Sequence, residues 1–125
     1  MTVDDEPAFL SVARDVILAT PGFEAVGEAL TGEDGIALVP FVRPQLVLMD
    51  VRMPGMGGIE ASRRIGRSGR GRIAVLLMSA DPQAVMPDLI PSETMGVVAK
   101  DRLCPRSLTT LWADWLGRHA LGAPR

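Results

Sequence analysis

Two uninterrupted apolar segments, Leu46–Met49 and Ile73–Met78, constrain the fold of this chain more than any other feature. A strand with one face in water alternates apolar and polar side chains, whereas a strand covered by helices on both faces is apolar throughout. These two segments therefore predict interior strands of a parallel sheet. Shorter apolar segments at Val3, Phe23–Val26 and Gly96–Ala99 bring the expected number of strands to five.

Helical periodicity between these segments predicts a doubly wound α/β fold with helices on both faces of the sheet. A first helix is expected from Pro7 until Pro21-Gly22 ends it, and a second from near Gly32. A third follows Gly57-Gly58 through Ile65. The second helix is expected to bury Ile36, Ala37 and Phe41.

The last two connecting segments differ from each other. Asp81–Thr94 contains Pro82, Pro87 and Pro91, and a proline inside a helix costs ~3 kcal/mol, so a short or broken helix is expected there. A regular helix is expected after Pro105, with an apolar stripe of Leu108, Leu111, Trp112, Trp115 and Leu116. The two tryptophans are interpreted as packing this helix on the sheet, and the alternative is that they anchor a partner.

Size and charge limit the class of protein. With 125 residues, 47% of them hydrophobic, the chain is expected to form one domain over residues 1–125. A net charge of -2 and a pI near 5.3 argue against direct binding of nucleic acid. No signal peptide or membrane-length apolar segment is visible, which predicts a soluble cytoplasmic protein without a membrane contact.

Some reactive or charged side chains receive no functional role. Cys104 is expected to be a small buried side chain, and His119 to face solvent near a helix end, because neither has metal-ligand neighbours in the sequence. Arginines cluster among glycines after the third helix, and a solvated loop is favoured there over a phosphate site. The cluster consists of Arg63, Arg64, Arg67, Arg70 and Arg72.

Polar side chains follow the predicted strands at the point where each strand ends: Asp4-Asp5, Asp50, Ser79 and Lys100. In an open parallel sheet, ligands bind outside the carboxyl ends of the strands, so these residues are expected to share one shallow site. Crowded carboxylates resist ionisation unless a cation neutralises them. The pattern therefore predicts a divalent-metal site with a nucleophilic aspartate.

Each residue of this site has a chemical role in phosphoryl transfer. Asp50 is the expected nucleophile and would form an acyl phosphate, with Asp5 as a direct ligand of Mg²⁺ and Asp4 acting through water. The Lys100 ammonium would pair first with Asp50 and then with phosphate oxygens. The Ser79 hydroxyl would donate to the same phosphate.

These motifs resemble the receiver domain of bacterial response regulators over essentially the whole chain. The matching segments are Val3-Asp4-Asp5-Glu6, Met49 to Gly58, Met78-Ser79-Ala80 and Ala99-Lys100-Asp101. The resemblance implies a flavodoxin-like strand order 2-1-3-4-5 and phosphorylation of Asp50 by a sensor histidine kinase. It also implies that Asp5, Asp50 and the backbone carbonyl of Arg52 hold Mg²⁺, and that Ser79 and Lys100 contact the phosphate.

The resemblance further implies an output surface and a parent protein. Phosphorylation is expected to reshape the face formed by Asp81–Thr94, the strand Gly96–Ala99 and the last helix, through which a homodimer is possible. The Lys100-Asp101 pair resembles that of receivers that precede a helix-turn-helix output, which favours a transcription regulator as the parent. Beyond self-phosphotransfer and slow autodephosphorylation, no enzymatic activity is expected.

Two departures from the family pattern leave alternatives open. Val97 occupies the position of the usual switch aromatic, and together with the prolines it favours a phosphorylation-independent interaction module, a pseudo-receiver. The intact acidic pair, Asp50, Ser79 and Lys100 argue against that alternative. The first strand is short, which indicates either a misassigned start or a trimmed chain. Lower stability is expected in either case. A third alternative is a phosphohydrolase similar to the haloacid dehalogenase-like enzymes, which need a second aspartate two residues after the nucleophile. Arg52 occupies that position, so any turnover is expected to be slow.

Overall fold

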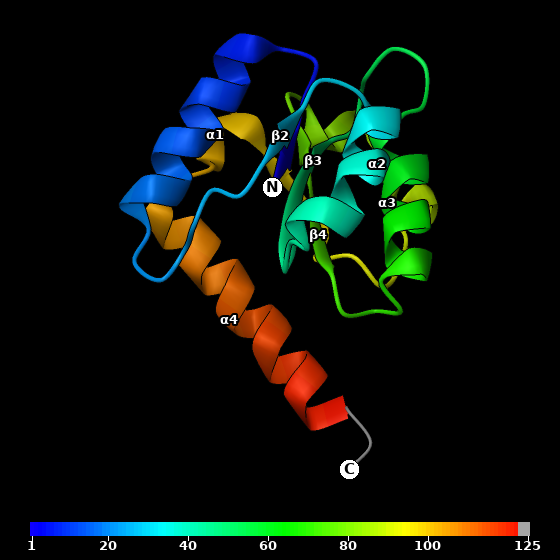
Figure 1. Cartoon of the computed structure of the whole chain (residues 1–125). Coiled ribbons are helices and arrows are strands. Elements are labelled where there is room, and N and C mark those ends of the chain that lie inside the picture. Colours follow the sequence, from blue (N-terminus) through cyan, green and yellow to red (C-terminus); the bar gives the residue numbers. More distant parts are fainter. Residues whose placement is uncertain (123–125) are drawn as a thin grey trace.

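The computed structural model describes residues 1–122, in which five parallel strands form one sheet between two layers of helices (Figure 1). The strand order is β2-β1-β3-β4-β5, which confirms the expected doubly wound α/β fold. The strands are β1 (Thr2–Val3), β2 (Glu28–Ala29), β3 (Leu46–Asp50), β4 (Ala74–Ser79) and β5 (Val97–Ala99). The expected domain boundary at residue 125 lies outside the described residues.

The helices cover the sheet in pairs, with α1 (Pro7–Ala19) and α4 (Pro105–Gly122) on one face and α2 (Gly32–Val42) and α3 (Gly58–Ser68) on the other (Figure 1). Side chains of β3 alternate between the two layers. Val47 and Met49 join the apolar cluster beneath α2 and α3, whereas Leu48 joins the cluster beneath α1 and α4. This two-sided burial explains why β3 and β4 are apolar throughout.

The predicted position of the second strand was wrong. Phe23–Val26 forms no strand, and β2 lies at Glu28–Ala29, because the backbone pairing with β1 begins where Thr2 donates a hydrogen bond to the carbonyl of Gly27. The Phe23 ring instead packs edge-on against Trp112, with 6.1 Å between ring centroids. Phe23 alone of this segment therefore packs on the core beneath α1 and α4, and the three residues after it are exposed.

The start of α2 was predicted correctly, but its buried face was not. Ile36 packs against the core as expected, whereas Ala37 is exposed and Phe41 is 84% exposed. Gly35 faces β1 so closely that a Cβ there would lie 2.8 Å from a methyl group of Val3. This close approach fixes the rotation of α2 and turns Phe41 toward solvent.

The proline-rich segment, where a short or broken helix is expected, contains no α-helix among its described residues. It forms two 3₁₀ turns, Pro82–Ala84 and Pro87–Leu89, and side chains such as Met86 remain exposed. In α4, Leu108 and Trp115 are buried and Trp112 is half-buried, which supports the packing role of the tryptophans. Leu116, predicted to belong to the same stripe, is 48% exposed.

The prediction that Cys104 is buried was wrong. Cys104 is exposed because it immediately precedes Pro105, the first residue of α4, and its sulfur accepts a hydrogen bond from the Ser107 amide. His119 is exposed as predicted and stacks on Trp115. Among residues 1–122, no helix is long and apolar enough to cross a membrane.

Candidate phosphoryl-transfer site

The carboxyl ends of β1, β3, β4 and β5 place the predicted site residues at one edge of the sheet. Asp50 and Ser79 are the last residues of β3 and β4, and Lys100 directly follows β5. A shallow depression there is lined by Asp5, Glu6, Asp50, Arg52, Ser79, Ala80, Asp81 and Lys100. The structure thus brings the residues together as the strand-end argument predicted.

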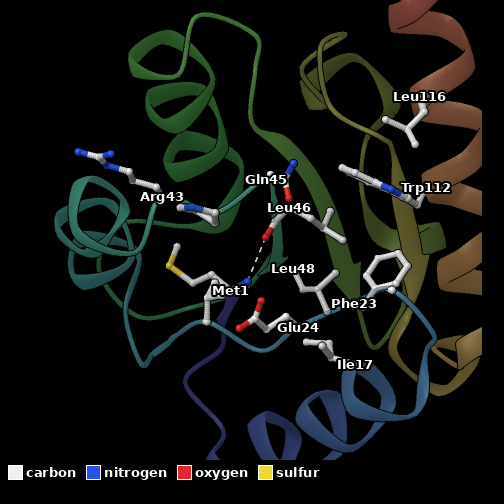
Figure 2. A pocket seen from close by; sticks show the side chains of 13 residues that line it. Met1, Ile17, Phe23, Glu24, Arg43, Gln45, Leu46, Leu48, Trp112 and Leu116 are labelled. Atoms are coloured by element: carbon white, nitrogen blue, oxygen red, sulfur yellow. Dashed lines mark hydrogen bonds between the residues drawn. The ribbon is translucent and has the colours of Figure 1, made fainter.

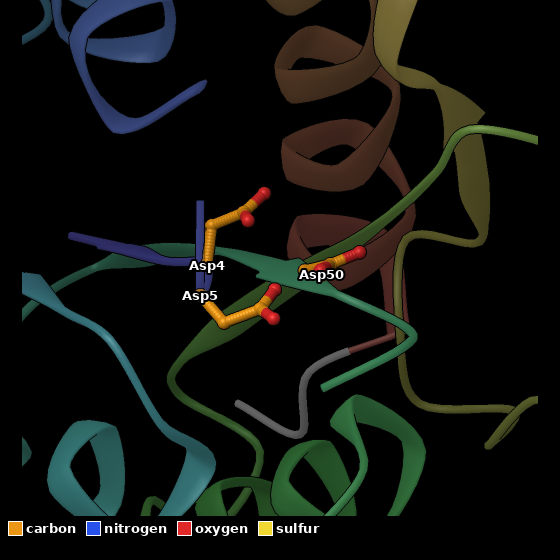
Figure 3. A group of neighbouring side chains, drawn as sticks. All are labelled: Asp4, Asp5 and Asp50. Carbon is orange, nitrogen blue, oxygen red and sulfur yellow. The ribbon is translucent and has the colours of Figure 1, made fainter. Parts of the chain in front are cut away.

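Three carboxylates cluster at this edge of the sheet (Figure 3). Asp4, Asp5 and Asp50 each offer an oxygen, and these three atoms lie within 4.8 Å of one another. Asp4 and Asp50 are buried, whereas Asp5 is exposed. Three negative charges at this separation repel one another, so the arrangement favours a bound cation or a retained proton.

Lys100 supplies the balancing positive charge in this structure. Its Nζ atom lies 2.7 Å from Oδ2 of Asp4 and 3.5 Å from Oδ1 of Asp50. Burial acts to lower the pKa of the ammonium, but the carboxylates around it outweigh burial, and the pKa is raised. Lys100 is therefore fully charged at neutral pH.

The Asp50 carboxyl is unusually reluctant to ionise. Burial and the negative charge of Asp4 raise its pKa to about 6, although Lys100 and a long hydrogen bond of 3.4 Å from the Arg52 amide oppose this shift. The carboxylate therefore has few donors of its own. A ligand that supplied positive charge would stabilise its ionised, nucleophilic form.

The loop between β3 and α3 positions this carboxylate, because the loop packs tightly against the end of β3. The Gly58 amide donates to the Val51 carbonyl over 3.0 Å, and a Cβ at Gly58 would lie 1.9 Å from the Asp50 carbonyl oxygen. Only glycine fits such an approach. Gly55, with a φ of 76°, supplies the reverse turn, so this glycine-rich segment serves loop geometry.

Ser79 lies at the opposite wall of the depression. Its hydroxyl oxygen accepts a hydrogen bond of 3.0 Å from the Asp81 amide, which leaves its hydroxyl hydrogen free to donate to a ligand. The loop that follows β4 is thereby tied to this hydroxyl. A ligand that moved Ser79 would act directly on the proline-rich segment.

The donor set fits a hard divalent cation such as Mg²⁺. Such ions prefer carboxylate, carbonyl and water oxygens, all of which are available here. Oδ2 of Asp4 is buried and receives no well-aligned hydrogen bond from the described residues, its partner being the ion pair with Lys100. Asp5 is exposed and able to bind an ion directly, whereas Oδ1 of Asp4 already accepts a hydrogen bond from the Glu6 amide.

Two neighbours of Lys100 were missed by reasoning from the sequence. Nζ donates a hydrogen bond of 3.1 Å to Oε1 of Glu6 and lies 4.7 Å from the centre of the Phe9 ring. In the sequence, Glu6 is visible only as part of the motif Val3-Asp4-Asp5-Glu6. Its place directly after Asp4-Asp5, at the same edge of the sheet as Lys100, was the signal that could have revealed it.

A second cavity lies at the opposite end of the sheet (Figure 2). Its walls include Phe23, Leu46, Leu48 and Trp112, and the Met1 amine donates a hydrogen bond of 3.0 Å to the Leu46 carbonyl there. It contains no group of neighbouring carboxylates. The chemistry suited to phosphoryl transfer therefore belongs to the depression at the carboxyl edge.

Comparisons with known proteins agree with this geometry. The chain matches the sequence model of the response regulator receiver domain over residues 1–109. The nitrate/nitrite response regulator protein NarL of Escherichia coli K12 is 36% identical over 90 residues, which are 71% of this chain and 42% of NarL. Response regulator GacA of Pseudomonas aeruginosa is 40% identical over 68 residues, 54% of this chain and 32% of GacA. This chain thus spans less than half the length of these two relatives.

Solved structures show the same fold. A LuxR-family two-component response regulator from Aurantimonas sp. SI85-9A1 superposes with a TM-score of 0.79 at 30% identity, covering 94% of this chain and 84% of that one. The signal receiver domain of the putative response regulator NarL from Mycobacterium tuberculosis superposes with a TM-score of 0.72 at 26% identity, covering 87% and 90%.

Proposed function

This chain belongs to the response regulator receiver domain family, and we propose that Asp50 accepts a phosphoryl group from a sensor histidine kinase in the presence of Mg²⁺. The observation that carries this proposal is the convergence of Asp4, Asp5 and Asp50 with Lys100 and Ser79 at one edge of the sheet. Lys100 is the one cation beside the three carboxylates among the described contacts of this site, so a second cation would balance their charge. A role as phosphoacceptor in two-component signalling is the family's function.

In the proposed reaction, an oxygen of Asp50 bonds to phosphorus as the bond from phosphorus to a nitrogen of the kinase phosphohistidine breaks. Asp5, Asp50 and the backbone carbonyl of Arg52 would hold the ion, with Asp4 acting through a water. Bound Mg²⁺ would neutralise charge on the phosphoryl oxygens. Lys100 and Ser79 would then donate to those oxygens.

The proposed output is a change in the surface next to Ser79. The Ser79 hydroxyl is bonded to the Asp81 amide, so its movement toward a phosphoryl group would release the start of the proline-rich segment. We place the partner-binding or homodimer face on Asp81–Thr94, β5 and α4. Because relatives such as NarL are longer, a transcription regulator with a helix-turn-helix output remains our proposal for the whole protein.

One observation favours a second candidate function. Val97 is half-buried and packs against the core beneath α2 and α3. Because its side chain is small and has no ring, it cannot swing between two positions as an aromatic side chain can. A receiver fold without that moving side chain suits a module that binds its partner regardless of phosphorylation. This pseudo-receiver would bind the partner equally well with or without a phosphoryl donor.

Intact mass spectrometry separates these functions. The protein is incubated with acetyl phosphate and Mg²⁺, beside Asp50→Asn and a sample with chelator. The proposal expects one added phosphoryl group in the wild-type protein and none in either control. A folded wild-type protein that gains no mass would contradict the phosphoacceptor function and favour the interaction module.

A further inference from the structure

Lys100 is held in this structure by more than the aspartates. Its Nζ atom lies 2.7 Å from Asp4 Oδ2, 3.1 Å from Glu6 Oε1 and 3.5 Å from Asp50 Oδ1. The ring of Phe9, in the first turns of α1, lies 4.7 Å from the same atom. The ammonium is therefore drawn toward β1 and α1, farther from Asp50 than from the other two carboxylates.

Glu6 differs from the other carboxylates around Lys100. Its side chain is 66% exposed and lines the rim of the depression, and it is not one of the three carboxylates that cluster as candidate metal ligands. Its backbone is fixed, because its amide donates a hydrogen bond of 2.9 Å to Asp4 Oδ1. Its backbone is thus held next to the candidate metal site, and its carboxylate is not part of that site.

We propose that Glu6 is a positioning residue that holds Lys100 in the resting site and releases it when Asp50 is phosphorylated. This inference rests on the proposed function. A phosphoryl group on Asp50 adds oxygens and negative charge on the Asp50 side of the ammonium. Lys100 moves toward these oxygens, and its hydrogen bond to Glu6 breaks.

The ion pair therefore opposes formation of the phosphorylated state. The free energy of the ion pair between Lys100 and Glu6 is lost each time Lys100 moves toward the phosphoryl oxygens. Removing the Glu6 charge therefore favours binding of a phosphoryl mimic. An ion pair this exposed changes an equilibrium by only a small factor, so the expected gain in affinity for the mimic in Glu6→Gln is about two- to fivefold. The face of the Phe9 ring also contacts Lys100 in this resting position.

The chain offers a direct probe of this movement, because Lys100 is its only lysine. Protein made with isotope-labelled lysine gives one set of lysine side-chain NMR signals. Beryllofluoride with Mg²⁺ serves as the phosphoryl mimic. Glu33→Gln is the matched control, because Glu33 is an exposed glutamate in the first turn of α2 that forms no ion pair among the described residues.

Two results are expected together. Glu6→Gln shifts the Lys100 signals of the resting protein, whereas its signals with beryllofluoride coincide with those of the wild type. Its affinity for beryllofluoride, measured by calorimetry, rises, and Glu33→Gln changes neither quantity.

Other results overturn the inference. Resting Lys100 signals that are unchanged by Glu6→Gln show that Glu6 does not hold the ammonium. A difference from the wild type that persists with beryllofluoride, or an affinity that falls or stays the same, shows that Lys100 is not released. A wild-type protein that binds no beryllofluoride contradicts the proposed function itself.

Discussion

Lys100 Nζ lies 2.7 Å from the fully buried Oδ2 of Asp4, and this ion pair joins the end of β5 to the end of β1 across the two strands between them. A buried carboxylate is tolerated only when it is paired. In the absence of a metal ion, Lys100 therefore stabilises the fold as well as preparing the site for a phosphoryl group.

Removing the lysine from this pair should be costly. Lys100→Met leaves the Asp4 carboxylate buried beside Asp50 without a cation, and we expect the free energy of unfolding in chelator to fall by about 3 kcal/mol. Urea denaturation measures this loss. The double variant Asp4→Asn/Lys100→Met should recover much of it, and a double variant no more stable than Lys100→Met would contradict this account.

Mg²⁺ should stabilise the folded protein through Asp5. The ion binds the folded state selectively, so the melting temperature rises with Mg²⁺ concentration. Asp5→Asn is expected to weaken Mg²⁺ binding by at least about tenfold, or ~1.4 kcal/mol, because it removes a charged direct ligand. Calorimetric titration tests this, with Asp101→Asn as a control at the same edge of the sheet. Equal losses in both variants would assign the effect to net charge alone.

The pKa of Asp50, raised to about 6, predicts a pH dependence of stability in chelator. The folded protein holds this proton more tightly than the unfolded chain, where the pKa is near 3.8. The contribution of Asp50 is therefore fully present below pH 4 and is lost as the pH rises through 6. The charged groups facing Asp50 are Asp4, Asp5 and Lys100.

Asp50→Asn isolates this titration from that of other carboxyl groups. The stability of Asp50→Asn relative to the wild type should increase between pH 4 and pH 6 and then level off. Denaturation curves recorded in parallel across this range measure the difference. A difference that is constant with pH would show that Asp50 ionises normally.

Gly58 should tolerate no side chain. A Cβ there would lie 1.9 Å from the Asp50 carbonyl oxygen, so Gly58→Ala forces the backbone apart and is expected to cost about 1–3 kcal/mol. Gly117→Ala is the matched control, because nothing lies within 4 Å of a Cβ at that position of α4. That variant should gain about 0.5–1 kcal/mol in stability from helix propensity. Thermal unfolding of both variants checks the contrast.

The sequence predicted the elements that depend on local patterns. β3 and β4 were found from continuous apolar segments, and α1 from its periodicity and the proline at its start. The site followed from the rule that ligands bind at the carboxyl ends of parallel strands. Each of these inferences needs only the residues within one segment and the order of the segments.

Errors arose where a distant contact decided the local structure. The apolar segment that begins at Phe23 predicts a strand. The prediction is wrong because Phe23 packs against Trp112, which lies far away in the sequence. Helical spacing predicts that Phe41 is buried. The prediction is wrong because the approach of Gly35 to Val3 sets the rotation of α2, and this contact is not visible in the sequence. The contact between Glu6 and Lys100 was missed for the same reason.

In the proposed reaction, Asp50 itself carries the phosphoryl group. Borohydride reduces an acyl phosphate of aspartate to homoserine, which tandem mass spectrometry locates in the sequence. After treatment with acetyl phosphate, Mg²⁺ and borohydride, we expect homoserine at position 50 and at no other aspartate. Homoserine at Asp4 or Asp5, or at none of the three, would contradict it.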